Sequence, residues 1–223
     1  MAFEGFKKEG QAFFRQLAVK QDRDWFKAHK DEYEELWDKP LKALFADLSG
    51  PVGKQYKGVT LAPAKIFRIY RDVRFSKDKS PFKTHAAAVL HARGGLEEGA
   101  LAAIYIHLGM EEFAGAGHWM LTPAQLKRYR AIVADPKLGP ELQRRCDALV
   151  KKGFELDSLE SLKRVPPGFD PDHPRAELLK RKGLGFSFPK FPANVRYTPK
   201  FAKWLVEQSA IVAPTVVWLE SKL

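Results

Sequence analysis

The stretch K-I-F-R-I-Y-R-D-V-R-F, which runs from Lys65 to Phe75, is the part of the sequence that indicates the fold. Its apolar side chains recur at every second position, and successive side chains of a β-strand point to opposite faces of a sheet. We therefore predict a strand over 65–75. One face of this strand is expected to carry Phe67, Ile69, Arg71, Val73 and Phe75.

The same alternation continues further along the chain. Ile104, Ile106 and Leu108 share one face of a later strand, and Tyr105 and His107 lie on its other face. The glycines at 94–95 and 115–117 are typical of turns. Because strands joined by short connections pair antiparallel, we predict an antiparallel, meander-like sheet over about 59–121.

Helical patterns flank this sheet on both sides. Before it, a helix capped by Asp22 or Asp24 is expected to end at the Ser-Gly-Pro of 49–51. After it, the T-P-A-Q of 122–125 is typical of a capped helix start. Since helices and strands are segregated along the chain, we predict an α+β fold, with helices packed on the sheet, and a single domain over 1–223.

Composition restricts the class of protein. The chain has 223 residues, a formal net charge of +11 and one cysteine, which excludes an internal disulfide framework. Its longest apolar run, 100–106, is too short to cross a bilayer, and the N-terminus lacks the apolar run of a secretory signal. We expect a cytoplasmic protein that binds no membrane and no cofactor, in an oligomeric state that the sequence leaves open.

Positive charge is concentrated in 65–83, which holds seven basic and two acidic residues. Charges on a half-buried strand are costly unless they are paired or face an anionic ligand. On the predicted strand Asp72 lies between Arg68 and Arg74 and would orient them, and Asp78 would orient other cations. The expected anion-binding residues are Arg68, Arg71, Arg74, Lys77, Lys79 and Lys83.

A purely structural role for these arginines is the competing interpretation. Arg68, Arg71 and Arg74 can instead pair with carboxylates of the N-terminal helix, and such networks commonly tie a helix to a sheet. The acidic residues available there are Asp31, Glu32, Glu34 and Glu35. The sequence leaves both interpretations open.

The basic segment also resembles a known bacterial family, the uncharacterised domain of unknown function 2461. The family's pattern R-x-x-R-D-x-R-F, a short spacer and D/N-K is matched here by 68–75 and 78–79, with Phe82 where the family commonly has tyrosine. The resemblance extends through Trp25-Phe26 with Tyr33, 115–119, 162–166 and 172–174. It implies no particular activity.

These observations favour a binding module for a phosphate-bearing ligand, either a nucleotide or a nucleic-acid backbone. One alternative is a metal-independent enzyme acting on an anionic substrate, with Asp72 or His85 as weak candidates for acid or base. Another is a structural motif in a protein whose function lies in protein–protein interaction. The histidine spacing does not suit a metal, so we expect none. Trp119 is a candidate for stacking on a base or a sugar.

Overall fold

The computed structural model describes residues 2–93 and 99–223, and its centre is an open antiparallel sheet. The strand order is β1-β2-β3-β4-β6-β5, and the predicted α+β class is confirmed. The predicted turn at 94–95 lies outside the described residues. The strands are β1 (Lys65–Ile66), β2 (His85–His91), β3 (Ala102–Gly109), β4 (Glu112–His118), β5 (Glu155–Asp157) and β6 (Leu184–Ser187).

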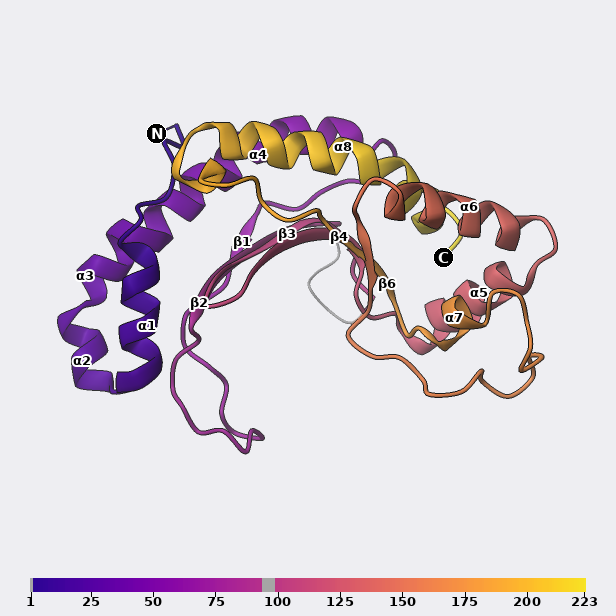
Figure 1. The fold of residues 1–223 in the computed structure, drawn as a ribbon, viewed down its shortest axis with the longest axis horizontal. Helices are drawn as coiled ribbons and strands as arrows, with labels where there is room; N and C mark the ends of the chain where they lie inside the picture. The colour runs from indigo at the N-terminus through magenta and orange to yellow at the C-terminus, as the bar shows by residue number, and fades with distance from the viewer. Residues whose placement is uncertain (1, 94–98) are drawn as a thin grey trace.

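The two faces of the sheet have different surroundings. In the central pair β2–β3, Ala88 lies opposite Ile106, and this register places Ile104, Ile106 and Leu108 on one face as predicted. That face is buried against α4 (Lys39–Gln55) and α8 (Lys200–Glu220), which lie along it in Figure 1. The side chains of Tyr105 and His107, on the opposite face, are half-buried.

The N-terminal helices form one arm beside the sheet (Figure 1). They are α1 (Gly10–Lys20), α2 (Arg23–Ala28), α3 (Lys30–Tyr33) and a π-helical turn (Glu34–Asp38) that leads into α4. Asp22 caps α2 by accepting a hydrogen bond from the backbone N–H of Trp25, as expected. The expected helix end at 49–51 is wrong, because α4 continues to Gln55 with Pro51 inside it.

The C-terminal half supplies a second arm and completes the sheet. Its helices are α5 (Pro123–Ala134), α6 (Leu138–Val150), α7 (Ala176–Lys180) and the 3₁₀ turn Val195–Tyr197. Thr122 and Gln125 form the predicted capping box of α5. The sheet extends beyond the predicted range, since β6 pairs with β4 and β5 pairs with β6. The glycines at 115–117 form part of β4 and are not a turn.

The predicted strand over 65–75 is largely wrong. Only Lys65–Ile66 forms β1, and the chain then leaves the sheet as a loop over 67–84, which we call the basic loop. Its two arms are joined near the sheet, where Arg71 N–H donates to the Pro81 carbonyl and Lys83 N–H to that of Ile69. Figure 1 shows this loop projecting away from α4 and α8. Its outer part is exposed, because burying its charged side chains would cost more free energy than leaving them in water.

Candidate anion-binding site

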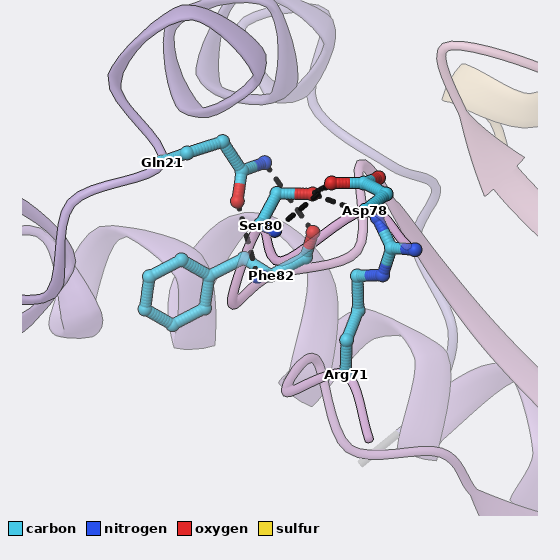
Figure 2. A network of polar contacts seen from close by, with 5 residues as sticks. All are labelled: Gln21, Arg71, Asp78, Ser80 and Phe82. Atoms are coloured by element: carbon cyan, nitrogen blue, oxygen red, sulfur yellow. Dashed lines mark hydrogen bonds and ion pairs between the residues drawn. The ribbon is translucent and has the colours of Figure 1, made fainter. Parts of the chain in front are cut away.

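The base of the basic loop is anchored to the N-terminal arm. The side-chain amide of Gln21, which follows α1, bonds both backbone groups of Phe82: its oxygen accepts from the N–H at 3.1 Å, and its nitrogen donates to the carbonyl at 3.3 Å. The Phe82 ring is buried and stacks on Phe26 of α2. These contacts, drawn in part in Figure 2, hold the loop at a defined distance from α2.

Arg71 closes the loop internally. Its guanidinium pairs with Asp78 and donates to the Ser80 hydroxyl at 2.7 Å (Figure 2). Hydrogen bonds from the Ser80 hydroxyl and backbone, together with the Arg71 contact, lower the pKa of Asp78 to about 2. Asp78 therefore stays ionised and orients Arg71. For Arg71 the structural interpretation fits, although its partners lie in its own loop and not in the N-terminal helix.

Arg74 is paired as well, but in the exposed part of the loop. Its guanidinium donates to both carboxylate oxygens of Asp72, at 3.0 and 2.7 Å, and three quarters of its side chain is exposed. This pair lowers the pKa of Asp72 to about 2, with a minor contribution from Arg68. Because the segment is not a strand, Asp72 does not lie between Arg68 and Arg74 as expected, and it contacts Arg74 alone of the two.

Several cations line a pocket of about 550 Å³ between α2 and the basic loop, which we call the basic pocket. Its apolar walls include the rings of Phe26, Tyr70 and Phe82. Among residues 2–93 and 99–223, Asp24 is the one carboxylate that lines it. The cationic side chains that line it are Arg23, Lys27, Lys30, Arg68, Arg71 and Lys79.

Most of the cations of the basic pocket are not neutralised. Among residues 2–93 and 99–223, none of Arg23, Lys27, Arg68 and Lys79 forms an ion pair. Lys79 donates instead to the Val73 carbonyl at 3.0 Å. Lys30 lies 3.5 Å from Glu34 on an exposed helix surface, where such a pair contributes little.

A second pocket, of about 620 Å³, also borders Phe82 and Arg71, and we call it the mixed pocket. Unlike the basic pocket, it contains comparable numbers of acidic and basic groups. Its other polar lining residues are Gln21, Asp72, Asp78, Ser80, Lys83, Thr84 and His85. The predicted site residues are thus divided among different pockets, and Arg74 and Lys77 line neither the basic nor the mixed pocket. Arg68 also lines a third pocket, of about 320 Å³, together with Glu34 and Asp38.

Comparison with known protein families identifies the chain. A family model described as "Conserved hypothetical protein (DUF2461)" matches residues 9–218. The chain belongs to the DUF2461 family. The resemblance seen in the sequence is therefore confirmed at the level of the family, whose description states no activity. Neither a curated protein nor a solved structure matches the chain.

His85, the first residue of β2, and Lys83, in the basic loop, both have lowered pKa values in this DUF2461 protein. Burial, the neighbouring His107 and Lys83 lower the pKa of His85 to about 4, so that its imidazole is neutral at pH 7. The two imidazoles stack with centroids 3.6 Å apart. Burial, and secondly Arg68, lower the pKa of Lys83. A neutral His85 can accept a proton, whereas the ionised Asp72 is held by Arg74.

Other candidate chemistry in this DUF2461 chain is limited. Within residues 2–93 and 99–223, no group of three or more His, Cys, Asp or Glu side chains is placed to hold a metal ion. Cys146 is buried, and burial raises the pKa of its thiol to about 12, which makes it unreactive. None of the described helices is both long enough and apolar enough to span a membrane.

The sequence analysis missed the contribution of α2 and α3. Arg23, Lys27 and Lys30 recur at spacings of four and three residues, which places them on one side of a helix. That spacing was the available signal. It could not be connected with the basic loop, because the contact between Phe26 and Phe82 joins segments far apart in the sequence.

Proposed function

We propose that this DUF2461 protein binds a phosphate-bearing ligand, a nucleotide or a nucleic-acid backbone, in the basic pocket. The observation that carries the proposal is that, within the described part of the chain, six cationic side chains and one carboxylate line a single pocket. Like charges held together repel one another, and an anion placed among them offsets that repulsion. A phosphate group supplies the charge and several acceptor oxygens at once.

The two kinds of cation in the pocket have complementary uses. Arg23 and Arg68 present planar guanidinium forks that can bond two phosphate oxygens together, and Lys27 and Lys79 act as mobile point charges. Arg71, held by Asp78 and Ser80, lines the same pocket in a fixed position. The anchored loop thus offers one preorganised guanidinium and several that remain free to adjust to the ligand.

An enzyme that acts on an anionic substrate is the second candidate. The mixed pocket places the neutral imidazole of His85 together with Lys83 and Arg71. This imidazole is unprotonated at pH 7, and an anionic substrate bound beside it would raise its pKa from about 4 toward the range in which a general base is effective. This candidate predicts turnover that is lost in His85→Gln while ligand binding in the basic pocket persists.

The binding proposal is tested with a fluorescently labelled oligothymidylate of about 12 nucleotides in low salt, with inorganic pyrophosphate as a competitor. Fluorescence anisotropy measures the association constant, and the logarithm of this constant should fall linearly with the logarithm of the salt concentration. Lys27→Glu should weaken it by about tenfold or more. Lys203→Glu makes the same charge change at an exposed lysine of α8 and should have a much smaller effect.

Two results would contradict the proposal. One is the absence of binding to either probe at about 50 mM salt, where electrostatic affinity is high. The other is an equal loss of affinity in Lys27→Glu and Lys203→Glu, because that would attribute binding to the net charge of +11 and not to the basic pocket.

A further inference from the structure

The sheet face turned away from α4 and α8 carries a connected row of aromatic rings. Its central member is Tyr105 of β3, whose ring lies 5.6 Å from that of Phe113 and 6.1 Å from that of Trp119. Phe67 meets Tyr105 edge to face at 6.2 Å, and His107 stacks on Phe113 at 4.9 Å. All five rings are half-buried, whereas aromatic rings of the core are fully buried.

The backbone of the sheet is adapted to hold Trp119 on this face. A β-carbon on Gly115 of β4 would lie 2.9 Å from the indole, and one on Gly185 of β6 would lie 3.0 Å from it. The indole therefore rests on strand positions that have no side chain. This contact explains the glycine at 115, within the segment for which the sequence suggested a turn.

Four of these rings, those of Phe67, Tyr105, Phe113 and Trp119, line a pocket of about 390 Å³, which we call the aromatic pocket. Its charged group is the carboxylate of Asp157, which accepts from the backbone N–H of Ser158 at 2.7 Å and from the Ser187 hydroxyl at 3.4 Å. Asp157 pairs with no cation among residues 2–93 and 99–223. The lining residues are Phe67, Val89, Ala102, Tyr105, Phe113, Trp119, Asp157 and Leu159.

Positive charge borders the aromatic pocket at Phe67. The ammonium groups of Lys65 and Lys83 lie 5.8 and 5.5 Å from the centre of the Phe67 ring. Lys83 also lines the mixed pocket, which shares Arg71 and Phe82 with the basic pocket. Lys83 therefore connects the border of the aromatic pocket with the pockets of the basic loop.

We infer that the aromatic pocket binds the base of a nucleotide whose phosphate lies against Lys65 and Lys83. Flat rings stack on aromatic side chains, and the Asp157 carboxylate can accept from the N–H groups at the edge of a base. A ligand with a positive charge is disfavoured by the two lysines, and a purely apolar ligand would use neither them nor Asp157. This inference rests on the proposed function, binding of a phosphate-bearing ligand. It adds a second point of contact beside the basic pocket, where Lys65 and Lys83 face the phosphate next to the base and the rings hold the base itself.

The test compares two labelled probes on the wild-type protein: a single-stranded oligonucleotide of about 12 nucleotides and an abasic strand of the same length. Both carry the same phosphates, so the difference between them reports the bases. We expect the strand with bases to bind about tenfold or more tightly. Equal affinities would overturn the inference and leave the proposed function intact. Binding of neither strand would overturn both.

A pair of matched variants locates the effect. Phe113→Leu should reduce the affinity for the strand with bases to that for the abasic strand, and it should leave the abasic strand unaffected. Phe75→Leu is the control, because its ring is 96% exposed and lies outside the aromatic pocket. If both variants bind as the wild type does, the inference is wrong. The probe comparison needs no variant and so does not depend on how Phe113→Leu folds.

Competition against the labelled strand distinguishes a free nucleotide from single-stranded nucleic acid as the ligand. Guanosine and adenosine monophosphates that displace the labelled strand at micromolar to millimolar concentrations would identify a free nucleotide as sufficient. Displacement by unlabelled strands alone would identify single-stranded nucleic acid. Both outcomes support a ligand that is bound through a base and a phosphate. Displacement by inorganic pyrophosphate as effective as that by the nucleotides would contradict a role for the base.

Discussion

The side chain of Gln21 and the backbone of Phe82 form a two-point contact in which one amide satisfies both a donor and an acceptor. Gln21 follows the last turn of α1 in a left-handed conformation, with φ of 39°. The contact mimics a pair of strand hydrogen bonds between segments that are far apart in the chain. It sets where the basic loop lies relative to the cations of α2.

Replacing Gln21 by alanine should destabilise the protein by about 1–3 kcal/mol, because both backbone groups of the buried Phe82 then lose their partner. Urea unfolding of the variant and the wild type measures the loss. Gln16→Ala, at an exposed position of α1, is the control and should change little. Equal stabilities of Gln21→Ala and Gln16→Ala would show that the contact does not hold the loop.

Arg68 and Arg74 should contribute unequally to ligand binding, although both belong to the sequence motif. Arg68→Gln should lower the affinity for a phosphate-bearing ligand by about tenfold, because Arg68 lines the basic pocket without a carboxylate partner among the described residues. Arg74→Gln should have a smaller effect, because Asp72 already neutralises Arg74 outside that pocket. Isothermal titration with pyrophosphate compares them, and a larger loss for Arg74→Gln would argue against the basic pocket.

The contact between His118 and Glu220 should stabilise the end of α8. Glu220 Oε2 lies 3.0 Å from Nε2 of His118, which is buried in β4, and Nδ1 of the same ring lies 3.1 Å from the Gly99 carbonyl. Glu220→Ala should cost about 1–3 kcal/mol in urea unfolding. Glu207→Ala, at an exposed glutamate of the same helix, should cost much less.

The Glu220 effect should also depend on pH in a defined direction. The imidazole of His118, 3.0 Å away, lowers the pKa of Glu220 in the folded protein. A lowered carboxyl pKa stabilises the fold above the ordinary pKa of the unfolded chain, and the stabilisation is lost as pH falls through the folded value. The difference between the wild type and Glu220→Ala should therefore narrow below about pH 4. A difference that widens there would contradict this assignment.

Because of His85, the stability of the fold should begin to fall at a higher pH than the pH at which carboxylates become protonated. Its pKa is about 4 when folded, against about 6.5 in an unfolded chain. Since the unfolded chain binds the proton first, stability is complete above about pH 6.5 and falls as pH drops toward 4. Melting temperatures measured across this range should fall less steeply for His85→Gln. Parallel curves for the two proteins would exclude this role of His85.

Local sequence rules predicted local structure well. The alternation of Ile104 to Leu108, the cap at Asp22 and the capping box at Thr122 each depend on residues within a few positions of one another. Each of these predictions is confirmed. The end of α4 was mispredicted because burial of Val52 outweighs the local cost of Pro51.

Features that depend on distant contacts could not be predicted in this way. β5 and β6 have three and four residues, too few for a recognisable alternation, and they form by pairing with strands remote in the sequence. At the candidate site, the sequence predicted Arg68 and Lys79 as anion-binding residues, but it could not predict the pocket that they line. The contributions of Arg23 and Lys27 require the packing of α2 on the basic loop.

The ends of the strand order also affect how molecules of this protein behave toward one another. The outermost strands, β1 and β5, have two and three residues, and charged side chains occur in both, at Lys65, Glu155 and Asp157. β5 offers few unpaired backbone groups to a neighbouring chain. At the other border, where 60–67 run beside β2, Pro63 has no backbone N–H and Lys65 is charged, and both features disfavour extension of the sheet. We therefore expect the protein to stay dispersed at high concentration and to resist fibril-like aggregation through its sheet.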